Sequence, residues 1–182
     1  MKPSITILSV LLGISLVATA GSNEPANKAA LRLVLSEVQP GALSSEQYCM
    51  LVFDDHNFHA EKAYRTKGKD RDRKVYQGRL SDADWNALIA ILDAKQFRDL
   101  HVPRSAPSLV AENLHPYAIS VARQNGFQNM EFLSKDSLKP YESQVKPLLQ
   151  WWKSARNQRL PESDAAADSR CSLSTGDAIF NN

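Results

Sequence analysis

The fold is decided by the stretch SDADWNALIAILDAKQFRDL, which runs from Ser81 to Leu100. Four of its apolar residues recur at helical spacing and form one stripe: Trp85, Leu88, Ile89 and Leu92. Ser81 suits the N-cap position, because its hydroxyl can accept a hydrogen bond from an unpaired backbone N–H of the first turn. A helix this short is not stable alone in water, so we expect its stripe to pack against a sheet.

Segments with the pattern of β-strands precede this helix. They are apolar throughout or alternate between apolar and polar residues: Leu31–Ser36, Tyr48–Phe53, Phe58–Tyr64 and Lys74–Gly78. Turn-forming residues, Asp54–Asn57, separate the second segment from the third and predict a hairpin. The fourth segment leads directly into the helix.

A second hairpin is predicted after the helix. Its strands, Tyr117–Arg123 and Phe127–Ser134, flank Asn125-Gly126, the preferred pair for a two-residue type I′ turn. Such a turn sets a register that places four apolar side chains on one face, with Val121 opposite Met130 and Ile119 opposite Phe132.

The remaining ordered element is a second helix over Ser137–Asn157, where apolar residues again recur at helical spacing. Pro147 lies inside it and lacks a backbone N–H, so we expect a kink or a break there. The segment His101–Pro116 has no periodicity and is rich in proline, which indicates a long loop.

These patterns predict a two-layer α+β domain. An antiparallel sheet of five or six strands would have one face covered by two helices, Ser81–Ala94 and Ser137–Asn157. The alternative is a pair of smaller half-domains joined through His101–Pro116.

The N-terminus has the features of a signal peptide. Lys2 supplies a positive charge, Ile5–Val17 is an apolar run too short to span a membrane comfortably, and Ala18-Thr19-Ala20 resembles a cleavage site. We therefore expect a periplasmic or extracellular protein with no transmembrane segment once residues 1–20 are removed. The rest should divide into a flexible leader, a single domain and a disordered acidic tail, over residues 21–30, 31–160 and 161–182 respectively.

The two cysteines, Cys49 and Cys171, allow two interpretations. In an exported protein they can pair in a disulfide, which here would close a very long loop. They can equally remain free thiols, since Cys171 falls in the expected disordered tail. The sequence leaves both interpretations open.

Catalytic and cofactor motifs are missing from the sequence. It contains no G-x-S-x-G elbow, no H-E-x-x-H helix and no glycine-rich phosphate loop, and we predict no cofactor. One group of side chains could bind a divalent metal: Asp54, Asp55, His56 and His59. We predict no metal site, because the group lacks a closed ligand spacing and has the ordinary composition of a turn.

Two loops supply the candidate binding residues. The basic loop contributes Arg65, Lys67, Lys69 and Arg71, and the proline-rich loop contributes His101, Arg104 and His115. Loops carried by a rigid scaffold often bind partners, and clustered cations favour an acidic one. The formal net charge of +2 gives no reason to expect nucleic-acid binding.

The arrangement around the first helix resembles small exported bacterial proteins of unknown function. In these a hairpin leads through a Gly-x-Leu-Ser turn into a helix with an aromatic-Leu exit. The corresponding residues here are Gly78-Arg79-Leu80-Ser81, Trp85–Leu92 and Phe97–Leu100. The resemblance implies an extracytoplasmic α+β domain and transfers no catalytic residue.

From these observations we expect a non-enzymatic binding or inhibitor-like module of the cell envelope. Its partner would be an envelope protein or an acidic ligand, and the sequence does not predict the oligomeric state. The alternative is a small hydrolase or metal-dependent enzyme that uses the loop histidines, because histidine transfers protons near neutral pH.

Overall fold

The computed structural model describes residues 29–41, 43–66, 72–103, 114–158 and 160–171. In these ranges the strands form one sheet in the order β6-β5-β1-β2-β3-β4-β7, and every neighbouring pair is antiparallel. The strands are β1 (Leu31–Pro40), β2 (Ser44–Phe53), β3 (Asn57–Thr66), β4 (Asp72–Arg79), β5 (Leu114–Arg123), β6 (Gly126–Ser134) and β7 (Glu162–Ser163). The helices are α1 (Asp82–Asp93), α2 (Lys95–Arg98), α3 (Lys135–Leu138) and α4 (Glu142–Asn157), with 3-10 turns η1 (Lys139–Tyr141) and η2 (Ser169–Cys171).

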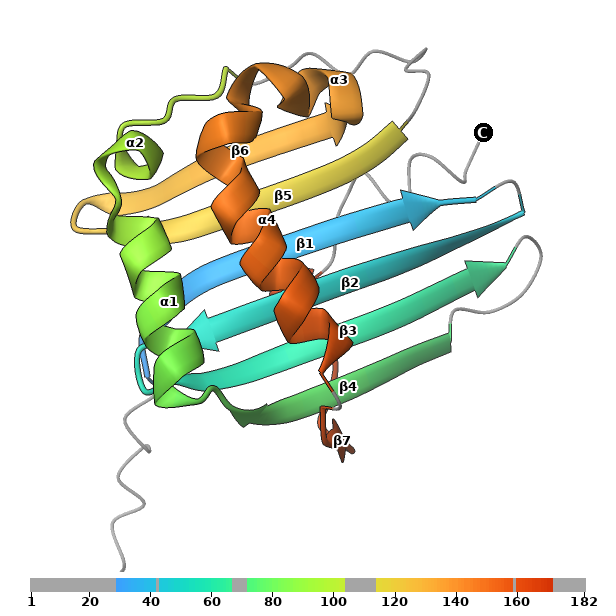
Figure 1. The fold of residues 1–182 in the computed structure, drawn as a ribbon. Coiled ribbons are helices and arrows are strands. Elements are labelled where there is room, and N and C mark those ends of the chain that lie inside the picture. Colours follow the sequence, from blue (N-terminus) through green and yellow to red (C-terminus); the bar gives the residue numbers. More distant parts are fainter. Residues whose placement is uncertain (1–28, 42, 67–71, 104–113, 159, 172–182) are drawn as a thin grey trace, which may run out of the picture.

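The α+β class and the single antiparallel sheet are confirmed, and α1 and α4 lie on the same face of the sheet (Figure 1). The strand count is higher than expected, because the described residues form seven strands. The extra strand is β7, which pairs only with Val75 and Tyr76 of β4. The alternative of two half-domains is wrong, since β5 pairs with β1 and joins both halves of the chain in one sheet.

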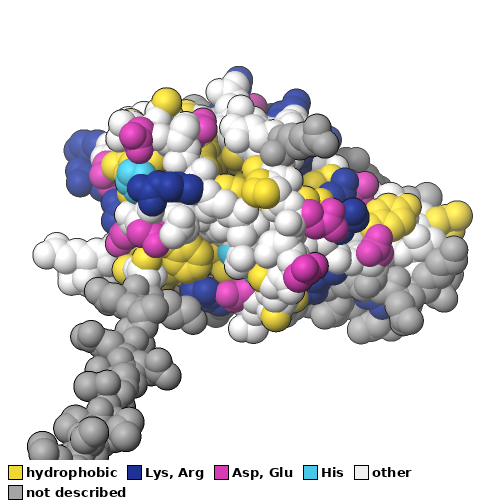
Figure 2. Space-filling model, turned by 90° about the horizontal axis from the view of Figure 1, so that it is seen from below, with side chains coloured by type: hydrophobic (Ala, Val, Ile, Leu, Met, Phe, Trp, Pro, Cys, Tyr) yellow, Lys and Arg dark blue, Asp and Glu magenta, His cyan; other side chains and the backbone are white. Residues whose placement is uncertain are grey.

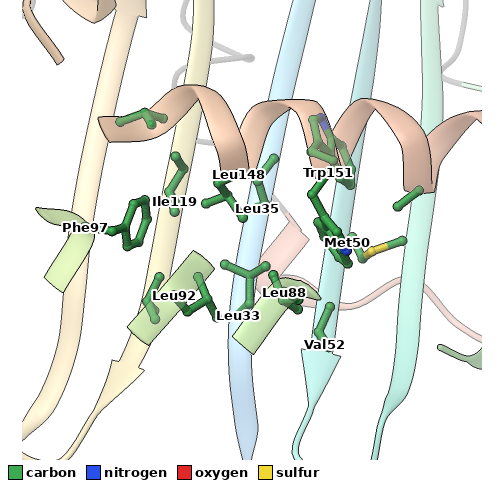
Figure 3. Close-up of a cluster of buried hydrophobic side chains, with 14 of the residues drawn as sticks. Leu33, Leu35, Met50, Val52, Leu88, Leu92, Phe97, Ile119, Leu148 and Trp151 are labelled. Atoms are coloured by element: carbon green, nitrogen blue, oxygen red, sulfur yellow. The ribbon is translucent and has the colours of Figure 1, made fainter. Parts of the chain in front are cut away.

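Helix α1 is capped and docked as its sequence predicts, with one exception. The Ser81 hydroxyl accepts the backbone N–H of Asp84 at 3.1 Å. Leu88 and Leu92 are completely buried between the helix and the sheet (Figure 3). Ile89 is only half-buried and lies outside the core cluster, where Ile91 packs instead. The apolar stripe is therefore rotated slightly from the one that the spacing suggested.

Truncation of Leu88 should measure how strongly α1 is held. Leu88→Ala should lower the free energy of unfolding by on the order of 3 kcal/mol, because the removed methyl groups leave a cavity in the core. Ile89→Ala is the matched control on the next residue and should cost well under half as much. Urea denaturation of both variants makes the comparison, and equal losses would contradict the observed orientation of α1.

The β5–β6 hairpin has the predicted faces but not the predicted register. Ile119 pairs with Met130 and Tyr117 with Phe132, a shift of two residues from the expected pairing. The turn is not type I′, because that type needs a positive φ at both central residues, and His56 is the only described non-glycine residue with one. A two-residue shift returns each side chain to the same face, so all four apolar residues are still buried.

The last helical region is interrupted at a different place from the one expected. Helix α4 continues through Pro147, and the chain instead changes direction at η1, between α3 and α4. Strand β5 also begins earlier than expected, since Leu114–Pro116 belong to it and not to the loop.

Beyond β7, which pairs at the edge of the sheet, the chain passes onto the sheet face opposite the helices as far as Cys171. Cys171 forms a disulfide with Cys49 of β2, and the pair packs with Leu51 in a small apolar cluster on this face. The Gln47 side chain donates a hydrogen bond to the Cys171 carbonyl at 2.8 Å. The expectation of a disordered tail from residue 161 is therefore wrong as far as Cys171, and residues 172–182 lie outside the described ranges.

Candidate functional site

A buried carboxylate, Glu37, lies beneath the C-terminal half of α4. Side chains alternate along a strand, so Glu37 follows Leu33 and Leu35 on the helix-covered face of β1. Its side chain is 2% exposed. Its contacts come from three elements: Gln39 Nε2 at 2.9 Å, His115 Nε2 at 2.8 Å, Tyr117 Oη at 3.2 Å, Trp152 Nε1 at 2.8 Å, and an ion pair with Arg156.

These contacts keep Glu37 ionised. Burial alone would raise its pKa, but hydrogen bonds from His115, Gln39 and Trp152 and the charge of Arg156 outweigh burial and lower the pKa to about 2. Tyr117 responds in the opposite sense, since burial and the neighbouring Glu37 carboxylate raise the pKa of its phenol. Glu37 therefore acts as a fixed anion that positions Arg156 and Trp152 at the end of α4.

Tyr48 lies next to this cluster, on the neighbouring strand and the same face. Glu37 and Tyr48 are register partners across β1 and β2. The Arg156 guanidinium carbon and the Lys62 ammonium each lie 5.1 Å from the centre of the Tyr48 ring. The Tyr48 hydroxyl donates to Glu46, which also forms an ion pair with Lys62. Two cations thus converge on one aromatic ring.

A hollow of about 450 Å³ opens beside Tyr48 where α4 ends, and we call it the α4 hollow. The sheet contributes the small apolar floor of Met50 and Ala60, and α4 contributes Trp152 and Arg156. Lys62, Tyr76 and Leu160 line its sides. The hollow exists because α4 stops at Asn157, while the short side chain of Ala60 leaves space on the sheet below.

A second buried carboxylate, Glu61, lies on the opposite face of the sheet. His59 Nε2 is 2.9 Å from it, Arg73 forms an ion pair at 3.0 Å, and the backbone N–H of Asp168 donates at 2.5 Å. Arg170 holds Asp168 through hydrogen bonds that lower the pKa of this carboxyl to about 2, against a smaller opposing effect of burial. This cluster fastens the C-terminal segment to β3.

The predicted binding residues are not gathered in one described site. Lys67, Lys69, Arg71 and Arg104 lie outside the described residues. Arg65 is in β3, and the register places the end of β3 and the start of β4 at the same end of the sheet as the start of β5. A binding surface formed by the basic loop and the proline-rich loop therefore stays a prediction. Strands β1 and β2 lie between β3, which carries Arg65, and β5, which follows the proline-rich loop.

The two loop histidines occupy different surroundings. His115 contacts Glu37 on the helix-covered face, whereas His101 is exposed beside Ser120 and Asn129. His115 was singled out as a loop residue, but it belongs to β5.

The turn candidates for metal binding also separate. His56 stacks on Trp85 with ring centres 4.4 Å apart, whereas His59 contacts Glu61. His56 has a φ of 68°, a strained value for a residue other than glycine, and its carbonyl accepts the N–H of Leu80 at 2.9 Å. Within the described ranges, no three His, Cys, Asp or Glu side chains are arranged to hold a metal ion.

Sequence reasoning missed the residues that build the α4 hollow, although one signal was present. Leu33 and Leu35 define the inward series of β1, and Glu37 is the next member of that series. A carboxylate at a buried position requires partners, so Glu37 could have been identified as the centre of a polar cluster. Apart from Gln39, its partners lie 78 to 119 residues away along the chain and could not be named from the sequence.

Comparison with known proteins adds no assignment: no protein-family model and no curated protein matches the chain. Among the described helices, none has both the length and the apolar character needed to cross a membrane.

Proposed function

We propose that the protein is an exported, non-enzymatic binding module of the cell envelope, and that it takes a small amphipathic ligand in the α4 hollow. The hollow itself carries this proposal. Its volume of about 450 Å³ falls within the range of small-molecule sites, and it combines an apolar floor with a few polar groups at one side.

The state of the polar groups favours binding over catalysis. A general base works best when its pKa is near the working pH, and Glu37 with a pKa of about 2 is a poor proton acceptor. Both of its oxygens also accept hydrogen bonds from neighbouring side chains. The alternative of a hydrolase using loop histidines has no comparable support, since His101 and His115 lie in separate surroundings.

Dye binding tests the proposed site. The neutral dye Nile red should bind the folded mature chain and fluoresce, and Ala60→Leu should weaken its binding about tenfold or more by filling the floor of the hollow. Ala87→Leu makes the same change on an exposed position of α1 and should leave binding unchanged. Equal dye binding by both folded variants would refute the α4 hollow as the site.

Export is supported by the features of residues 1–20 and by the disulfide, since disulfides persist in oxidising compartments. The intact mass of the product recovered from the periplasm or the medium should correspond to a chain that begins at Gly21 or within a few residues of it. A full-length product retained in the membrane would contradict export.

A further inference from the structure

The cations beside the α4 hollow are the feature that bears on its ligand. Lys62 from β3 and Arg156 from α4 are far apart in the sequence, yet both lie against the ring of Tyr48. Their partner carboxylates, Glu46 and Glu37, are not part of the lining. Glu61 borders the hollow, but its carboxylate is held by His59 and Arg73 on the other face.

We propose that the α4 hollow selects organic anions, with an apolar tail over Met50 and Ala60 and an acidic head group at Lys62 and Arg156. The inference rests on the proposed function and specifies the chemistry of its ligand. A carboxylate, sulfonate or phosphate head group would serve, because each offers oxygen acceptors to an ammonium and a guanidinium.

The existing ion pairs leave room for such a head group. Lys62 Nζ is 3.6 Å from Glu46 Oε2, and the two side chains are 41% and 36% exposed. This ion pair therefore contributes little to stability, and Lys62 can bind a second anion beside Glu46. Arg156 contacts Glu37 through Nη1, and a guanidinium has five N–H donors, which gives it capacity for a second acceptor. Arg156 can therefore hold a ligand without releasing Glu37.

The protonation of the neighbouring groups agrees with this role. The hydrogen bond with Tyr48 outweighs burial and raises the pKa of Lys62, which keeps the ammonium charged at neutral pH. Burial and the hydrogen bond to Glu46 raise the pKa of Tyr48, so its phenol stays neutral and adds no negative charge to the wall.

Three probes built on eight-carbon chains separate head-group charge from apolar binding: octanoate, 1-octanol and octyltrimethylammonium. Binding can be followed by the indole N–H resonances of the three tryptophans, below the concentrations at which the probes self-associate. The Trp152 resonance should shift with octanoate, whereas Trp85, which stacks on His56 away from the hollow, should not. Octanoate should bind more tightly than octanol, and octyltrimethylammonium least of all.

Lys62→Gln should weaken octanoate binding by about fivefold, which is the largest effect expected from losing a partly exposed ion pair. The same substitution should change octanol binding by less than about twofold. Lys153→Gln removes an exposed charge from α4 outside the hollow and should leave octanoate binding unchanged. Octanol binding as tightly as octanoate, or equal effects of the two lysine variants, would overturn the anion preference while leaving Nile red binding intact. If Nile red does not bind the wild-type protein at all, the α4 hollow is instead refuted as a binding site.

Discussion

Replacement of Glu37 by glutamine should cost about 3–5 kcal/mol of unfolding free energy at pH 7, because Arg156 and the other donors would lose a buried anion. Urea denaturation measures the loss. Glu131→Gln makes the same change at an exposed position of β6 and should alter stability by less than about 0.5 kcal/mol. A loss below about 1 kcal/mol for Glu37→Gln would mean that this cluster is not needed to hold α4.

The same residue should govern the response to acid. The pKa of Glu37 falls from its ordinary 4.5 to about 2 in the folded protein, which corresponds to roughly 3 kcal/mol. Since the folded pKa is the lower one, this stabilisation is present above about pH 4.5 and is lost as the pH falls toward 2. Glu37→Gln should therefore flatten the pH dependence of stability in that window, and an unchanged profile would contradict the assignment.

Loss of the Cys49–Cys171 disulfide should have an effect of similar size. The bond joins residues 122 positions apart, and closing so long a loop should stabilise the folded protein by about 5 kcal/mol in the chain-entropy model. The Cys49→Ser/Cys171→Ser double variant should show this loss in urea denaturation. Hydrogen exchange should also become faster at Glu162–Cys171, which the disulfide helps to hold against the sheet.

Reducing agent provides the control for this prediction. It should destabilise the wild-type protein by about as much as the double substitution does, and it should have no effect on the double variant. A wild-type protein whose stability is unchanged by complete reduction would show that the C-terminal segment is held by its other contacts, such as those to Glu61.

Local features of the fold could be predicted because neighbouring residues carry the information. The hydroxyl of Ser81 and the stripe through Leu88 define α1 without reference to the rest of the chain. The alternation of Leu31, Leu33 and Leu35 likewise identifies β1, and Leu33 and Leu35 lie on its helix-covered face, whereas an irregularity in the register places Leu31 on the opposite face.

The β5–β6 register could not be predicted, because two registers that differ by two residues bury the same side chains. A distant contact distinguishes them in the structure: the Gln128 side chain donates to the carbonyls of Phe97 and Leu100 at 3.0 and 2.8 Å. The turn composition of Asn125-Gly126 carries no information about α2, where Phe97 lies.

The candidate site depends even more on distant contacts. The α4 hollow forms between β2, β3 and the end of α4, and its size depends on where α4 stops and on how small Ala60 is. The cations of the proposed site, Lys62 and Arg156, come from β3 and α4 and are not those of the basic loop. On the face of the molecule seen in Figure 2, basic and acidic side chains are interspersed. The distribution of charge on this face therefore does not indicate a binding site for an anion.

A crystal structure of the mature chain grown with octanoate would show whether the α4 hollow binds organic anions. We expect the alkyl chain of octanoate to lie over Met50 and Ala60, with its carboxylate within hydrogen-bonding distance of Lys62 or Arg156. Octanoate bound elsewhere on the molecule, with an α4 hollow that holds only solvent or is closed by protein side chains, would contradict it.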